Sequence, residues 1–113
     1  MFFSSSDISN LDKIDRLKLI NSITGLKPAN LIGTKSLNGN TNLAIFSSIV
    51  HIGSNPPLIA FVTRTSKKVS RHTLENIIKT KKYTINQIQK NFVKKAHYTS
   101  AKFEENISEF EMC

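Results

Sequence analysis

The sequence predicts a mainly β domain with helical insertions, arranged as a small β-barrel. Residues 29–63 hold short, largely apolar segments separated by turn residues, which is typical of a strand meander. A helical pattern follows them and precedes a further alternating segment at residues 83–88. No glycine-rich turn joins a first strand to a first helix, so the pattern does not favour a doubly wound sheet.

The composition is that of an ordinary globular protein. Its 113 residues amount to one domain at most, with 39% hydrophobic and 21% charged residues. No apolar run approaches the ~18 residues that a bilayer crossing needs. Phe2 and Phe3 are followed by serines, a start too short and too polar for a signal peptide. We expect one cytoplasmic domain over residues 1–113, without a membrane partner.

An amphipathic helix is predicted over residues 8–24, where apolar residues recur at every third position. Ser9 or Asn10 suits the N-cap, and Asp12 suits the first turn. Gly25 is expected to end the helix.

The β section follows. Residues 29–37 form a strand candidate, and Asn-Gly-Asn at 38–40 is a hairpin signal, because Asn and Gly tolerate a positive φ. Residues 41–52 are predicted to form one long strand or a strand pair, and 53–57 a turn. Residues 58–63 are almost all apolar, which predicts a central buried strand.

The second half alternates between helices and a strand. After a polar loop at 65–70, a helix is expected from an N-cap at Ser70, with Leu74, Ile77 and Ile78 on one face. Residues 83–88 alternate as a strand does.

Two further helices are expected near the end of the chain. Residues 91–98 are predicted to form one of them, with Phe92, Val93 and Ala96 facing inward. A short helix through Phe103 and Ile107 is predicted to follow, with Thr99 or Ser100 as its cap.

The charge is strongly positive and uneven. The net charge is +8, and residues 64–102 contain eleven Lys or Arg against the single acid Glu75. Such a balance fits either a nucleic-acid surface or a solvated surface around a pocket for an anionic cofactor. The cations are scattered rather than packed into one run, which favours the second reading.

The side chains that could bind a metal are sparse. Cys113 cannot form an internal disulfide, and His51, His72 and His97 lie far apart without zinc-site spacing. We therefore expect no metal site.

A phosphate site is suggested at Arg71-His72-Thr73, because a helix N-terminus offers free N–H groups and partial positive charge. A capped helix with surface charges explains these residues equally well. Polar residues within the apolar segment 42–48, together with Asn86, need partners if buried, either backbone groups or a bound polar ring system. Residues 97–101 place further polar groups between two helices.

Catalytic motifs that depend on side chains alone are absent from the sequence. It has no G-x-S-x-G motif, no P-loop and no paired carboxylates in an apolar setting. An enzyme with so few acids, bases and nucleophiles would take its chemistry from a cofactor.

Six segments in order, with compatible spacing, resemble the flavin reductase-like family. They are ANLIGT (29–34), NLAIFSS (42–48), GSNPPL (53–58), RHTLENI (71–77), YTIN (83–86) and AHYTSAKF (96–103). The resemblance implies an FMN-binding split β-barrel that usually forms a homodimer. Members pass hydride from NADH or NADPH to flavin, or use bound FMN in related redox steps. The implied cofactor is FMN, with FAD as the alternative.

The resemblance also implies site residues. The flavin ring and ribityl chain would be lined from the segment 42–48, by Asn42, Ala44, Phe46, Ser47 and Ser48. The phosphate would be held by Arg71, His72 and Thr73, with Arg64 nearby. The pocket border would include Asn86, Ser100 and Ala101. No catalytic side chain is implied, because hydride chemistry belongs to the flavin.

The sequence departs from the family pattern at several places, one of which is the loop at 66–69, more basic than the family pattern. Thr65 follows Arg64 where relatives often have proline, and Gln87 stands where they often have histidine. Family members also continue past a Ser-Glu-Phe motif like that at 108–110 with strands that complete the barrel. We therefore expect this chain to hold an incomplete barrel, the N-terminal portion of the domain.

Three functional hypotheses follow. The first is a flavin-dependent oxidoreductase or an inactive remnant of one. The second is a flavin-binding or dimerising module without catalysis. The third is a basic nucleic-acid-binding domain, which is disfavoured because the sequence shows neither an RNA-stacking motif nor a recognition helix.

Overall fold

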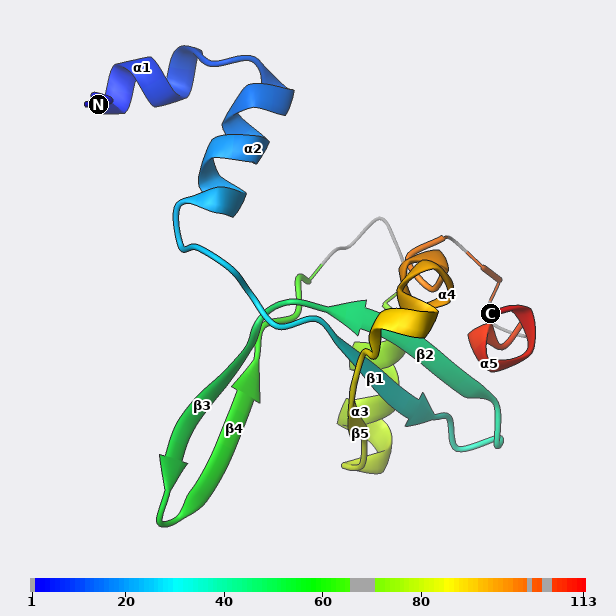
Figure 1. The fold of residues 1–113 in the computed structure, drawn as a ribbon. Coiled ribbons are helices and arrows are strands. Elements are labelled where there is room, and N and C mark those ends of the chain that lie inside the picture. Colours follow the sequence, from blue (N-terminus) through cyan, green and yellow to red (C-terminus); the bar gives the residue numbers. More distant parts are fainter. Residues whose placement is uncertain (1, 66–70, 102, 105–106) are drawn as a thin grey trace.

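Five strands form two separate sheets in the computed structural model, which describes residues 2–65, 71–101, 103–104 and 107–113 (Figure 1). The three-stranded sheet has the order β2-β1-β5 and is antiparallel throughout. Its strands are β1 (Asn30–Lys35), β2 (Thr41–Phe46) and β5 (Thr84–Gln87). The second sheet is the hairpin of β3 (Ile49–Ser54) and β4 (Pro57–Phe61). The predicted class, β structure with helical insertions, is confirmed.

The first hairpin follows the sequence prediction. β1 pairs with β2 from Asn30 opposite Phe46 to Lys35 opposite Thr41. Gly39 in the connection has a φ of 94°, a conformation that glycine adopts without steric cost. The predicted turn at 38–40 is therefore confirmed.

The prediction of a central buried strand at 58–63 is wrong. β4 pairs with β3 only, and Leu58 and Ile59 keep 49% and 55% of their surface exposed. Their apolar character predicted burial, but β3 is the only described element with extensive contacts to β4. Of the two alternatives for residues 41–52, the strand pair is the one observed, because the chain leaves the first sheet at Ser47.

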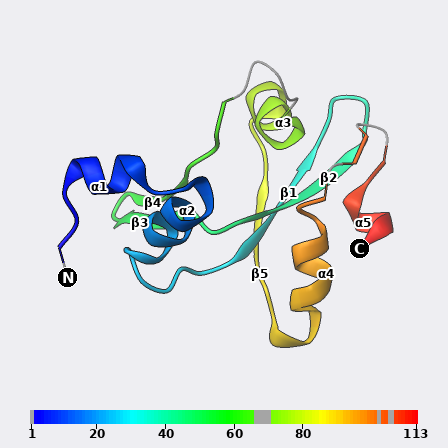
Figure 2. The same ribbon diagram turned by 90° about the horizontal axis from the view of Figure 1, so that it is seen from above.

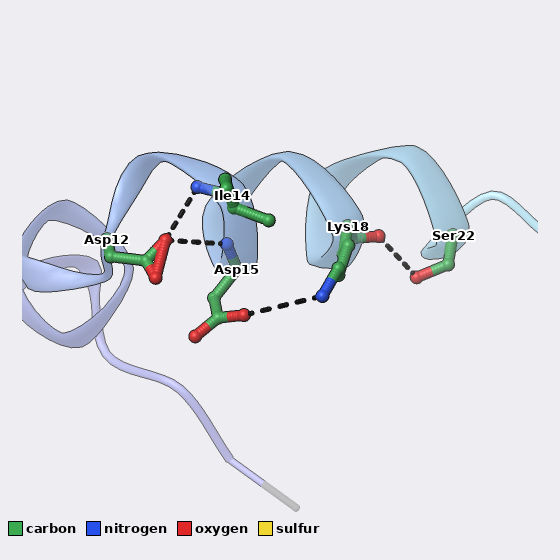
Figure 3. Close-up of polar contacts among 5 residues, drawn as sticks. All are labelled: Asp12, Ile14, Asp15, Lys18 and Ser22. Carbon is green, nitrogen blue, oxygen red and sulfur yellow. Dashed lines mark hydrogen bonds and ion pairs between the residues drawn. The ribbon is translucent and has the colours of Figure 1, made fainter.

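The predicted helix over residues 8–24 is two helices, α1 (Ser5–Asn10) and α2 (Lys13–Ser22). Leu11 is extended, and the Asp12 carboxylate accepts hydrogen bonds from the amides of Ile14 at 2.6 Å and Asp15 at 2.9 Å (Figure 3). These backbone bonds, that from Asp15 foremost, hold the pKa of Asp12 below its ordinary value. An Asp side chain that caps free amides starts a new helix here, which the apolar period did not predict.

The expected N-cap at Ser9 or Asn10 is also wrong. Ser4 caps α1 in a reciprocal capping box with Asp7. Further along α2, Lys18 lies 3.9 Å from Asp15, and the Ser22 hydroxyl donates to the Lys18 carbonyl (Figure 3). The apolar stripe of α2 is largely exposed, since both helices stand away from the three-stranded sheet (Figure 1).

α3 (His72–Thr80) begins near the predicted position, and Ser70 lies outside the described residues. Arg71 occupies the N-cap position without a side-chain capping bond. Ile78 is 57% exposed, so the predicted inward face is wrong there. The buried residues of the helix are instead Thr73 and Asn76, because the sheet offers them polar partners.

The predicted helix at 91–98 is confirmed as the 3-10 turn η1 (Lys90–Phe92) followed by α4 (Val93–Tyr98). Ala96 is buried as expected, whereas Val93 is exposed. The expected short helix through Phe103 and Ile107 is not found in the described residues there. A later helix, α5 (Glu109–Met112), begins after Ser108.

The helices cover the three-stranded sheet from both sides (Figures 1 and 2). α3 contacts β1 and β2 on the face of Ile32, and α4 and α5 lie on the opposite face. The buried hydrophobic core of the described residues is small and consists of Leu31, Ile32 and Ala96. Among the described residues no strand pairs with the second edge of β2. This free edge lies between the two helical layers, and it positions the site.

Candidate functional site: a cleft along the free edge of β2

A buried polar cluster joins α3 to the sheet. The Asn42 side-chain amide of β2 donates to the Thr73 hydroxyl at 2.9 Å. The Asn76 amide donates to the Thr34 hydroxyl of β1 at 3.2 Å. All four side chains are buried, so their hydrogen bonds offset the cost of removing them from water. This cluster fixes the first turn of α3 against β2.

A cleft of about 550 Å³ opens beside that first turn. One wall is the end of β2 and the start of the following loop, and a second wall is the beginning of α3. The chain after β4, the segment that follows α4 and the first residue of α5 supply the rest. Its lining residues are Ala44, Ile45, Phe46, Ser47, Ser48, Val62, Thr63, Arg64, Arg71, His72, Thr73, Leu74, Thr99, Ser100 and Glu109.

Positive charge gathers at the α3 side of the cleft. Arg64 and Arg71 are exposed cations on its lining, and His72 is the first residue of α3. The Arg71 amide donates to the Glu75 carboxylate at 3.2 Å, which closes the turn before the helix. The first turn of α3 and two arginines therefore border the same space, an arrangement that favours an anion.

The hydroxyl groups around the cleft differ in the hydrogen bonds that they already form within the protein. The Ser48 hydroxyl donates to the Val62 carbonyl at 2.9 Å and accepts from the Val62 amide at 3.2 Å, so it ties the two ends of the β3–β4 hairpin together. The hydroxyls of Thr99 and Ser100 donate to carbonyls of α4. Ser47 is exposed on the cleft wall.

One buried acid was missed by the sequence predictions. Glu109 is 7% exposed, and its Oε2 accepts from the Leu43 amide at 2.9 Å on the edge of β2 away from β1. It also lines the cleft. The sequence around Glu109 gives little indication of this role. Ser108 before it is typical of a helix N-cap, and no sequence spacing predicts a contact with β2.

Nine of the twelve predicted site residues therefore line one cleft, and three do not. Asn42 is not part of the lining, but it donates to Thr73, which is. Asn86 lies on β5, where its amide donates to the Leu31 carbonyl and the Thr84 hydroxyl. Ala101 is exposed beyond the end of α4 and is not part of the lining. Their roles toward a ligand stay predictions.

The family model for flavin reductase-like domains matches residues 26–113 of this chain. The chain belongs to the flavin reductase-like family. The match covers the cleft and both sheets and begins after α2.

Solved structures show the same fold. This flavin reductase-like chain superposes with a TM-score of 0.90 and 46% identity on a protein assigned as a flavin reductase with a split-barrel domain from Shewanella frigidimarina, covering 99% of this chain and 55% of that one. Nitrilotriacetate monooxygenase component B from Bacillus cereus gives a TM-score of 0.83 at 20% identity, covering 99% and 54%. The 2-nitrobenzoate 2-nitroreductase of Pseudomonas fluorescens gives 0.78 at 24% identity, covering 99% and 51%. The expected split-barrel fold is thereby confirmed.

The flavin reductase-like chain spans about half the length of the proteins that it matches. An uncharacterized protein of Aquifex aeolicus is 25% identical over 95 residues, which are 83% of this chain and 48% of that protein. The elements described here are thus part of the fold that those longer proteins have. Within the described residues, no helix is long and apolar enough to span a membrane.

Proposed function

We propose that this chain supplies the flavin-binding part of an FMN-dependent oxidoreductase that passes hydride from NADH or NADPH to flavin. The observation that carries the proposal is the cleft in which the cationic start of α3 meets the free edge of β2. FAD is the alternative cofactor.

The lining of the cleft fits the two ends of FMN. Arg71, Arg64 and the first N–H groups of α3 suit the doubly charged phosphate. Ala44 and Phe46 offer a small and a flat apolar surface for a ring system. A single helix N-terminus with two guanidinium groups suits the one phosphate of FMN better than the pyrophosphate of FAD.

The protein would bind and orient the cofactor, and bound flavin would supply the hydride-accepting chemistry. The buried cluster around Asn42 keeps the start of α3 in register with β2, so that cationic groups and the strand edge face one ligand. Phe46 packs edge-on against Phe61, with 5.1 Å between the ring centroids. This contact would restrict the motion of the cleft wall that faces the flavin ring.

The decisive test measures FMN affinity by quenching of flavin fluorescence. Arg71→Ala is expected to raise the FMN Kd about tenfold or more, because one charge-assisted hydrogen bond is lost. Riboflavin, which lacks the phosphate, should bind the variant and the unchanged protein alike. Lys79→Ala removes the same charge from the last turn of α3, away from the cleft, and is the matched control.

Anaerobic addition of NADH or NADPH to the FMN-loaded protein tests the hydride donor. Bleaching of the flavin absorbance supports the reductase. The proposed binding function is contradicted if folded protein binds neither FMN nor FAD at micromolar concentrations.

A second candidate is a flavin-binding, homodimerising module without catalysis. It is favoured by the exposed apolar side chains of the β3–β4 hairpin, Val50, Ile52, Leu58 and Ile59, which a second subunit could cover. Sedimentation of the FMN-loaded protein tests dimerisation. Bound flavin that NADH and NADPH both leave oxidised would favour this module over the reductase.

A further inference from the structure

We infer that Glu109 is a positioning residue of the cleft, whose carboxylate accepts a hydrogen bond from the imide N–H of the bound flavin ring. The inference rests on the proposed function and names a contact at the end of the cleft opposite the phosphate. It begins from the free edge of β2, where Glu109 stands in place of a neighbouring strand.

Two contacts hold the segment 108–109 on that edge. Glu109 Oε2 accepts from the Leu43 amide at 2.9 Å, and the hydroxyls of Ser108 and Thr41 lie 2.7 Å apart. Leu43 and Thr41 both belong to β2, so the segment 108–109 runs along this strand. Its contacts occupy the edge where a neighbouring strand would otherwise form hydrogen bonds. The alternation of an antiparallel ladder turns the Ile45 amide toward the same edge, further along the cleft.

The position of Glu109 gives the cleft two electrically different ends. The α3 side presents Arg64, Arg71 and the helix N-terminus, whereas the α5 side presents a carboxylate. A ligand that enters with an anion at one end therefore meets an acceptor at the other, and that end of the ligand has to donate. The imide N–H of an isoalloxazine ring is such a donor, and the phosphate of FMN is such an anion.

A buried carboxylate is a costly choice if its only task is to cap one amide, because a neutral side chain could accept the same bond. Glu109 lies on the lining of the cleft, and Oε2 is the oxygen that accepts from the Leu43 amide. A carboxylate has a second oxygen that can accept a hydrogen bond. We therefore assign the cap to Oε2 and the flavin contact to Oε1.

The test compares Glu109→Gln with Glu111→Gln. Glu109→Gln keeps an oxygen that can accept a hydrogen bond from the Leu43 amide but removes the negative charge. Glu111→Gln removes the same charge from an exposed side chain of α5. The probes are FMN and FMN methylated at the imide nitrogen, which cannot donate there. Hydrogen exchange at the Leu43 amide reports whether the cap persists without ligand.

Glu109→Gln is expected to raise the FMN Kd about tenfold over Glu111→Gln, as a charge-assisted bond becomes a neutral one. The methylated flavin should bind both variants within about twofold of each other, and Leu43 exchange should stay near that of the unchanged protein. Equal FMN affinity in the two variants, or equal weakening for both flavins, overturns the inference and leaves the proposed function standing. If the unchanged protein binds no FMN, both fail together.

Discussion

The three-stranded sheet and the β3–β4 hairpin are built from similar apolar segments, yet they differ in burial. Ile32 in β1 has 0% of its surface exposed, whereas Ile59 in β4 retains 55%. α3 covers one face of the sheet, and α4 and α5 cover the other (Figure 2). The hairpin has no comparable cover among the described elements and extends away from the helices (Figure 1). Burial here depends on which elements reach each face, more than on the residues of the strand.

The two regions also differ in how polar groups hold them. The sheet is joined to α3 by buried side-chain amides and hydroxyls, which must be satisfied within the protein. At the base of the hairpin, the Ser48 hydroxyl bonds to the backbone of Val62, which is an exposed residue. This contrast predicts that equivalent substitutions destabilise the sheet much more than the hairpin.

The largest difference is expected between Ile32→Ala and Ile59→Ala. Truncating Ile32 should lower the free energy of unfolding by about 3 kcal/mol, because buried methyl groups are lost and a cavity remains. Ile59→Ala should cost less than about 0.5 kcal/mol, as is usual for an exposed position. Urea denaturation followed by circular dichroism measures both. Similar losses in the two variants would show that the hairpin is covered in solution.

A smaller difference is expected between Asn42→Ala and Ser48→Ala. Asn42→Ala leaves the buried Thr73 hydroxyl without its donor, and we expect a loss of about 2 kcal/mol. Ser48→Ala removes two bonds to backbone groups that water can reach, at a cost of about 0.5 kcal/mol. The same denaturation experiment applies. A double variant of Asn42 and Asn76 should lose less than the two single losses added, since both side chains share Thr34.

The smallest expected effect is on the pKa of the Cys113 thiol, which follows α5 on the covered face of the sheet. Burial, and secondly the negative charge of Glu109, raise the pKa of the Cys113 thiol. A raised pKa means less thiolate at a given pH, so alkylation of the folded protein should reach half its maximal rate at a higher pH than in urea. The folded state correspondingly loses stability as the pH rises through the pKa of the unfolded thiol toward that of the folded one.

Iodoacetamide labelling followed by mass spectrometry gives both profiles. Glu109→Gln should move the folded profile toward lower pH, and Glu111→Gln should leave it in place. Superimposable folded and unfolded profiles would contradict the raised pKa of the thiol.

Local signals predicted much of the chain correctly. Asn-Gly-Asn at 38–40 made the first hairpin readable, because positive φ is a local property. The segments that resemble the flavin reductase-like family pointed to the matched domain and the fold. The helix at 91–98 was likewise readable from its period. The Asp12 cap was misread, because the apolar period over residues 8–24 runs through the break that this side chain makes.

The amino-acid order alone settled where most strands and helices form, and that the start of α3 carries cations. It did not settle which apolar strand is buried, because Ile32 and Ile59 have the same side chain and differ only in their distant neighbours. Nor did it show Glu109 on the edge of β2, since its bond to Leu43 spans 66 positions. Local geometry is governed by nearby dihedral preferences and caps, whereas burial and long-range hydrogen bonds exist only once the chain has folded.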